Sequence, residues 1–235
     1  MLKKALGLFL IVFIFPVFSF AAKTYVIDTP THGLLSYGSY DFGFRCFSKG
    51  NVITSIDFGV FKPLDIGMFW ELDRLIGDDN IKVAIPTLNV KFEIYEGSMV
   101  LPGIAIGYNG QGYFIDTSLK SGFIQKARGL YVVLGRELFF DGFMLNVGAN
   151  VYDFSVVKVY GFINAIFPIF KEFLYFMTEY DNINYFPEAR LNCGLKLSLS
   201  EYLDVDCIVR DCFGKEDITR ITNERILRLS YSGKF

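Results

Sequence analysis

The sequence predicts an all-β protein, a closed antiparallel transmembrane β-barrel of about twelve strands. About twelve segments of roughly ten residues alternate apolar and polar side chains, with the period of a strand and the length of a tilted membrane-spanning strand. Aromatic residues make up 17% of the chain and occur with 22 Gly and many Val, Ile and Leu, a composition typical of β-structure. After residue 22, no apolar stretch is long enough for a membrane-spanning helix.

The first 21 residues have the pattern of an export signal. Lys3 and Lys4 precede an uncharged apolar run over 5–18, and residues 19–21 (Ser-Phe-Ala) have small residues at the two positions that a signal peptidase reads. We expect cleavage after Ala21. An uncleaved membrane anchor is the alternative, but Pro16 and the small residues at the exit argue against it.

Four segments of the mature chain alternate most clearly: 64–73, 87–95, 143–151 and 203–210. In each, every second residue is apolar and most of those between are polar or Gly, which predicts a strand with two different faces. Eight further segments fit less well, and Pro102 removes a ladder donor from one of them. These are residues 37–47, 52–61, 100–108, 129–137, 157–167, 172–180, 189–198 and 224–235.

The links between the strands alternate in length. Every second link is short, whereas most of the intervening links are longer and rich in Asp, Asn, Lys and Gly. Transmembrane barrels sort their loops in this way, with short turns on the periplasmic side and long loops outside. A soluble β-sandwich has no reason to do so. We therefore expect residues 37–235 to form the barrel, with both termini on the inner side and residues 22–36 as a periplasmic or plug segment.

The polar faces of the strands carry many ionisable groups. An unpaired buried charge costs several kcal/mol or more, so these groups predict a hydrated lumen or ion pairs across it. With nine acids against six bases, an open lumen would slightly favour cations. A barrel of about twelve strands can be open or closed. The predicted lumen-lining residues are Asp41, Arg45, Asp57, Asp65, Glu71, Asp73, Lys91, Glu93, Lys158, Glu179, Lys196, Asp204, Asp206, Arg210 and Arg228.

The last strand carries a resemblance. Residues 224–235 alternate and close with Tyr231, Gly233 and Phe235, and this ending resembles the assembly signal of the outer-membrane β-barrel proteins of Gram-negative-type bacteria. The resemblance implies delivery by periplasmic chaperones, insertion by the barrel assembly machinery, and residence in outer-membrane lipid; we expect a monomer. The opening Asp-Thr-Pro-Thr-His-Gly of residues 28–33 is similar to the YjbH-like barrels linked to exopolysaccharide export, from which no functional residue is carried over.

The sequence predicts no enzyme, cofactor site or metal site. His32 is the only histidine, it precedes the first strand, and it lacks the converging partners that a catalytic site needs. The Asn-Gly-Gln-Gly of 109–112 lacks the Lys and the helix of a phosphate-binding loop. The acidic clusters at 78–80 and 211–217 lack the spacing of a calcium loop. The net charge of −2 gives no basic footprint for nucleic acid.

The four cysteines have no CxxC pattern and no nearby histidine, so a zinc site is not expected. If the turn near Ser200 pairs its flanking strands symmetrically, Cys193 falls opposite Cys207. A bridge directly across neighbouring strands is usually strained, so we expect the cysteines to be small, lipid-facing apolar residues.

These predictions point to a narrow porin, or an envelope transport protein, that passes small solutes passively. Residues 22–36 are predicted to enter the lumen as a plug. A non-conducting structural or adhesive barrel is the first alternative. An outer-membrane hydrolase that uses His32, and a soluble periplasmic sandwich, are the others.

Overall fold

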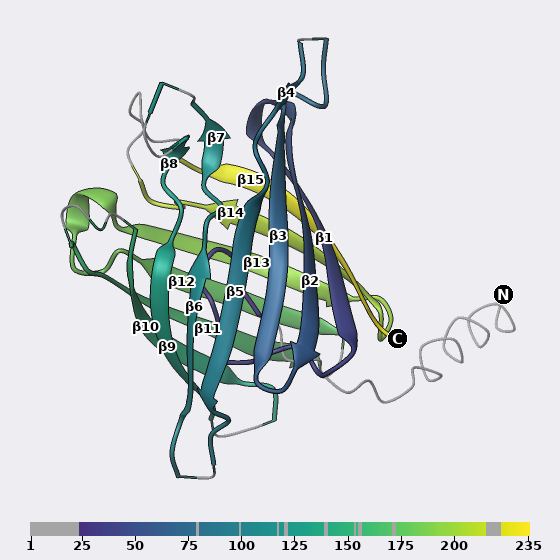
Figure 1. The fold of residues 1–235 in the computed structure, drawn as a ribbon, viewed down its shortest axis with the longest axis vertical. Coiled ribbons are helices and arrows are strands. Elements are labelled where there is room, and N and C mark those ends of the chain that lie inside the picture. The colour runs from purple at the N-terminus through teal and green to yellow at the C-terminus, as the bar shows by residue number, and fades with distance from the viewer. Residues whose placement is uncertain are drawn as a thin grey trace, which may run out of the picture.

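The chain forms a ring of antiparallel strands in the computed structural model, shown as a ribbon in Figure 1. The described residues are 24–78, 80–98, 100–116, 118–119, 122–138, 141–152, 154, 157–170, 173–214 and 222–235. The ring comprises β1 (Ser39–Phe47), β2 (Asn51–Phe61), β3 (Leu64–Asp73), β5 (Thr87–Tyr95), β6 (Gly103–Asn109), β9 (Gly129–Glu137), β10 (Met144–Val151), β11 (Tyr160–Phe170), β12 (Leu174–Asp181), β13 (Arg190–Ser198), β14 (Leu203–Arg210) and β15 (Glu224–Lys234).

The sheet closes on itself. Each strand pairs with its neighbour in this order, and β15 returns to β1 in a register that runs from Ser39 opposite Lys234 to Cys46 opposite Leu227. A closed ring leaves no strand edge, so the backbone groups of every strand find partners within the sheet. The predicted fold class, a closed antiparallel barrel of twelve strands, is confirmed.

Most predicted strand positions agree with the structure, and the bounds of β3, β5, β9 and β14 are those expected from the alternation. The largest difference is β11, which begins at Tyr160 and not at residue 157. Val157 lies in a turn and has a positive φ of 45°, a conformation that is rare for a β-branched residue. Short pieces outside the ring were not predicted: β4 (Lys82–Val83), β7 (Tyr113–Ile115), β8 (Phe123–Gln125) and the 3₁₀ turns η1 (Ser48–Gly50) and η2 (Phe186–Glu188).

The apolar face of the ring points outward. Leu88, Val147 and Trp70 are 55%, 48% and 47% exposed, whereas Glu71 and Lys91 are buried inside. A soluble sandwich would bury the apolar set and expose the charges. The structure therefore contradicts the sandwich alternative.

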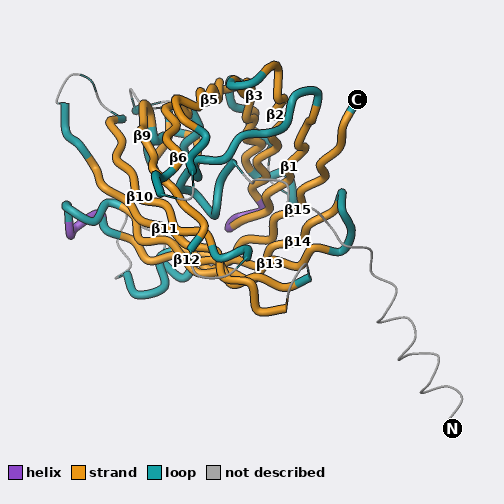
Figure 2. The backbone as a smooth tube through the Cα atoms, turned by 90° about the horizontal axis from the view of Figure 1, so that it is seen from below, coloured by secondary structure: helices purple, strands orange, loops and turns teal. Residues whose placement is uncertain are grey.

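The N-terminal segment lies inside the ring, where Thr29 and Gly33 bond to the buried wall residues Glu179 and Lys91. The end view in Figure 2 shows loop segments within the ring of strands. Tyr25 and Pro30 form an isolated antiparallel bridge, and the Val26 amide donates to the Thr29 carbonyl over 3.0 Å. We call residues 24–36 the N-terminal hairpin segment. Val26 and Ile27, at its tip, are completely buried.

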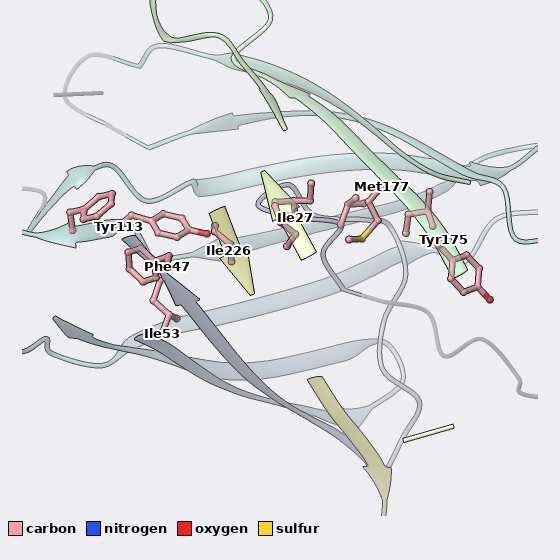
Figure 3. Packing of buried hydrophobic residues seen from close by; sticks show 11 residues of the cluster. Ile27, Phe47, Ile53, Tyr113, Tyr175, Met177 and Ile226 are labelled. Atoms are coloured by element: carbon pink, nitrogen blue, oxygen red, sulfur yellow. The ribbon is translucent and has the colours of Figure 1, made fainter. Parts of the chain in front are cut away.

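An apolar layer inside the ring receives this tip. Figure 3 shows Ile27 between Ile226 and Met177, in a row that continues to Phe47 and Tyr113. The barrel interior is therefore not uniformly polar, because one level of it is a small hydrophobic core built from wall and hairpin side chains.

The predicted pairing of two cysteines is wrong. Cys193 lies opposite Val209, and Cys207 lies opposite Leu195. The turn is centred one residue later than expected, because Ser200 Oγ accepts bonds from the amides of Tyr202 and Leu203. That displacement moves the partner of Cys193 by two residues.

Tyr231 and Gly233 lie near the end of β15, and Phe235 follows it. Tyr40 on β1 lies opposite Gly233, and its ring covers that glycine. The centroid of the Tyr40 ring is 5.0 Å from that of the Phe235 ring. Their role as an assembly signal stays a prediction. The export signal expected at 1–21 lies outside the described residues. Within the part of the chain that is described, helices suited to crossing a membrane are absent.

Candidate functional site: the barrel lumen

Most of the predicted lumen-lining residues lie on the inward face of the ring. A buried group of nine comprises Asp57, Asp65, Glu71, Lys91, Glu179, Lys196, Asp206, Arg210 and Arg228, and a half-buried group comprises Asp41, Arg45, Asp73, Glu93 and Asp204. Lys158 differs: it precedes β11, and its ammonium lies over the ring of Tyr185 in the adjoining outer loop. The late start of β11 leaves Lys158 outside the wall.

Glu179 on β12 receives the backbone amides of the hairpin tip. Its carboxylate accepts bonds from the amides of Ile27 (3.3 Å), Asp28 (3.1 Å) and Thr29 (2.9 Å), and from Thr29 Oγ1 (2.6 Å). A non-helical segment buried away from water must find partners for its N–H groups. One wall carboxylate supplies them for three successive residues.

Basic wall residues bind the carbonyls of the same segment. Arg228 Nη2 donates to Val26 O over 2.6 Å, and Lys91 Nζ donates to the carbonyls of Thr24 (2.8 Å) and Gly33 (2.7 Å). Arg128, just before β9, donates to the Asp28 carbonyl over 3.2 Å. The charged side chains of the lumen therefore hold the hairpin segment in place through hydrogen bonds to its backbone.

The Asp28 side chain joins the hairpin tip to two strands and an outer loop. Arg45 Nη1 on β1 lies 2.8 Å from Oδ1, Arg210 Nε on β14 lies 2.6 Å from Oδ2, and the Tyr113 hydroxyl donates to Oδ1. Burial favours the protonated acid, but the guanidinium groups of Arg210 and Arg45 outweigh it and hold the pKa of Asp28 below its ordinary value. Asp28 is thus an ionised side chain that links the hairpin segment to the wall and to the outer loop.

The link from β6 to β9, residues 110–128, folds inward from the opposite side. Tyr113 and Phe114 are buried against Phe47, the Phe114 amide donates to Glu71 Oε1 over 3.0 Å, and Arg210 Nη2 donates to Gln125 Oε1 over 2.7 Å. The guanidinium of Arg210 lies 3.8 Å from the centroid of the Tyr113 ring. The two inward segments meet at Asp28.

His32 packs on a flat patch of the wall made by two glycines. Gly103 and Gly135 lie directly opposite each other on β6 and β9, and a Cβ on either would overlap the imidazole ring. His32 Nδ1 lies 2.9 Å from Asn146 Oδ1. Burial lowers the pKa of His32, and the bond to Asn146 only partly opposes it. An amide neighbour cannot play the acid role of a catalytic triad.

A cavity of about 600 Å³ runs beside the hairpin segment. It follows β1, where Asp41, Gly43 and Arg45 all line it, and it also touches Arg190 and Ser198, the first and last residues of β13. Among the described residues that line it, seven side chains are acidic and seven are basic. The cavity therefore has no excess of either sign, in contrast to the slight acidic excess counted from the strands alone. The acids are Asp28, Asp41, Asp57, Asp181, Glu188, Glu201 and Asp204, and the bases are Arg45, Lys126, Arg128, Arg190, Lys196, Arg210 and Arg228.

Two groups of lumen residues were not predicted from the sequence. One group is apolar: Ile208 and Ile226 face inward, two residues along their strands from Asp206 and Arg228. Apolar residues at inward positions could have indicated that an apolar segment lies in the lumen. The other is Arg128 with Asp181, joined at 3.0 Å, which fell just outside the expected strands. In the described residues, no cluster of three or more potential metal ligands is present.

No protein-family model and no curated protein sequence matches the chain. Solved structures do. A KdgM porin aligns over 84% of this chain and 99% of its own, with 11% identity and a TM-score of 0.50. A mutant of the Rh. blastica porin (84% and 98% coverage, 9% identity, TM-score 0.39) and Salmonella typhi OmpF in complex with daunomycin (83% and 96%, 10%, 0.31) also align. The first likeness establishes the fold, a porin-type barrel.

Proposed function

We propose that the chain is a monomeric channel of the bacterial outer membrane through which small solutes diffuse passively, narrowed by its own N-terminal hairpin segment. Export through a cleaved signal and insertion by the barrel assembly machinery are parts of this proposal. The outward apolar face suits lipid, because charges on that face are costly whereas the lumen tolerates them.

The cavity along β1 carries the proposal. It reaches from Ser198 at the end with the short links to Arg190 at the end with the long loops, and both polar and apolar atoms line it. The hairpin segment contacts the opposite wall through Asn146 and Lys91. A passage beside a fixed filler restricts the width of what can pass, so we propose small, hydrophilic solutes without a preference for either charge sign.

Conductance tests the function directly. The full-length protein, folded in detergent and verified by heat-modifiable migration on a gel, should produce discrete current steps in planar bilayers. Its reversal potential in a salt gradient should lie near zero, since the lining is balanced in charge. Folded protein that gives no current steps would refute the channel and favour the structural or adhesive barrel.

The hydrolase alternative has less support. It needs His32 beside an acid and a hydroxyl, whereas His32 is packed on Gly103 and Gly135 with Asn146 at Nδ1. We therefore propose a non-enzymatic channel. Ester or amide hydrolysis that is lost in a His32→Ala variant would overturn this part of the proposal.

A further inference from the structure

Two thiols lie side by side at the outer end of the wall, where β14 ends. The Cys212 amide donates to the Leu191 carbonyl over 2.8 Å, which places Cys212 against β13. The Cys212 thiol donates to the Val209 carbonyl over 3.5 Å, and Val209 is the residue directly opposite Cys193 on the neighbouring strand. Cys193 also has the Thr178 hydroxyl 3.7 Å from its sulfur.

This pair avoids the strain of a bridge across a strand ladder. The ladder partner of Cys193 is Val209, and the chain leaves the sheet at Asp211, whose φ is +53°. Cys212 therefore lies beyond the last ladder pair. Its position is fixed from both sides, because the Asp211 amide also donates to Asn192 Oδ1 over 2.8 Å. Bridging requires two cysteines whose backbones lie close together, and these contacts hold Cys212 between Leu191 and Val209, the residues next to Cys193 along and across the sheet.

We propose that Cys193 and Cys212 form a disulfide under the oxidising conditions that an exported protein meets, and that this bridge ties the start of the outer loop 211–223 to β13. The oxidant is a disulfide of a protein or of a small thiol. One cysteine thiolate attacks that disulfide, forming a mixed disulfide and releasing one thiol. The second cysteine thiolate then displaces the other thiol. The two cysteines lose two protons and two electrons, and the oxidant gains the electrons as two thiols.

The neighbourhood sets the rate of this exchange. Burial raises the pKa of the Cys212 thiol, and the adjacent Cys193 thiol raises it further. Because the thiolate is the nucleophile, we expect the bridge to form faster as the pH rises from 7 to 9.

The four cysteines fall in four different tryptic peptides: 46–49, 191–196, 197–210 and 211–215. Membranes that contain the exported full-length protein are incubated with oxidised glutathione, quenched in acid, and alkylated in SDS so that every free thiol reacts irrespective of burial. After digestion without reductant, we expect peptides 191–196 and 211–215 as one linked species, two hydrogens lighter than their sum. Cys46 and Cys207 should carry the alkyl group.

Two variants serve as matched controls. Cys207→Ser should leave the linked species unchanged, whereas Cys212→Ser should abolish it and leave Cys193 alkylated or carrying glutathione. The proposal is overturned if wild-type Cys193 and Cys212 are alkylated, if each carries glutathione separately, or if Cys193 is linked to Cys207. Heat-modifiable migration verifies folding in every sample.

Discussion

At the scale of single residues, Asp28 is the side chain on which the interior most depends. Its carboxylate meets Arg45 and Arg210 at 2.8 and 2.6 Å, and only 12% of its side chain is exposed. Breaking one member of a buried ion pair leaves the other charge uncompensated. The hairpin segment, the outer loop and two wall strands all lose an anchor if Asp28 is neutralised.

We predict that Asp28→Asn lowers the free energy of unfolding by about 3 kcal/mol, the usual cost of breaking a buried pair. Denaturant titration of the barrel in lipid vesicles measures it. Glu96→Gln is the matched control, because Glu96 pairs with Lys62 in full contact with water and its loss should leave the unfolding midpoint unchanged. Equal effects of the two variants would show that the ion pairs of Asp28 do not stabilise the folded barrel.

The same carboxylate predicts a pH dependence. The pKa of Asp28 is lower in the folded protein than in the unfolded chain, so its contribution to stability is present above the unfolded value, about 3.9, and is lost as the pH falls toward the folded value. The stability difference between wild type and Asp28→Asn should be equal at pH 7 and pH 5. Below pH 3.9 it should shrink by about 1.4 kcal/mol per pH unit. A difference that is constant from pH 7 to pH 3 would contradict this assignment.

Whether the sequence predicts an interaction of a lumen residue depends on how far along the chain its partner lies. The phase of Asp206, Arg210 and Arg228 was readable from the alternation, because neighbouring residues in a strand face opposite sides. Their partners in the N-terminal hairpin segment were not, since Arg228 binds Val26 and Arg210 binds Asp28, about two hundred residues away along the chain. Alternation gives a direction and contains no information on what lies across the lumen.

At the scale of elements, the hairpin segment and the wall fit each other through shape as well as charge. Gly135 has room for no side chain, because Asn146 and His32 occupy the space beside its Cα. Adding a methyl group there must displace both of them. The glycine pair on β6 and β9 is therefore a docking surface for the imidazole of His32.

We predict that Gly135→Ala lowers the free energy of unfolding by about 1–3 kcal/mol, as overpacking usually does. In a His32→Ala background the same substitution should cost less, because the methyl group then overlaps only the Asn146 side chain, which has lost its bond to His32. Gly161→Ala on β11 is the control, since its nearest neighbour would be 3.8 Å away. If the cost of Gly135→Ala is the same with and without His32, the docking surface has been wrongly identified.

Removing the hairpin segment should widen the passage. We predict that deletion of residues 24–36 raises single-channel conductance, because water replaces the hairpin against Glu179, Lys91 and Arg228, and hydrated charges are tolerated in a barrel lumen. Heat-modifiable migration verifies that the shortened barrel folds. Unchanged conductance in a folded deletion variant would mean that the segment does not narrow the channel.

Strands were far easier to predict than the inward loops. Residues 64–73 alternate over their full length because lipid lies on one side and charge on the other. Residues 110–128 show no such pattern, and their Gly and Asn indicated only an exposed loop. Tyr113, Phe114 and Phe123 turn this link inward, yet buried aromatics in a loop are indistinguishable in sequence from the aromatics of a membrane interface.

At the scale of the whole molecule, the proposed function depends on which face of the sheet points outward. The outward positions of β3 include Ile66, Met68 and Trp70, and the inward positions include Asp65 and Glu71. The ring closes without a free edge, so the outer surface can meet acyl chains while charge and water remain inside. Every functional proposal above requires this arrangement.

Trp70, the only tryptophan in the chain, reports on this arrangement directly. In vesicles of lipids brominated near the headgroup end of the acyl chains, we predict strong quenching of its fluorescence and little quenching by aqueous iodide. A Phe69→Trp, Trp70→Phe double variant moves the indole one residue along β3, to the inward side where Phe69 faces Tyr25, and should escape the brominated lipid. Trp70 that is insensitive to brominated chains, or an indole at 69 that they quench equally, would contradict the account.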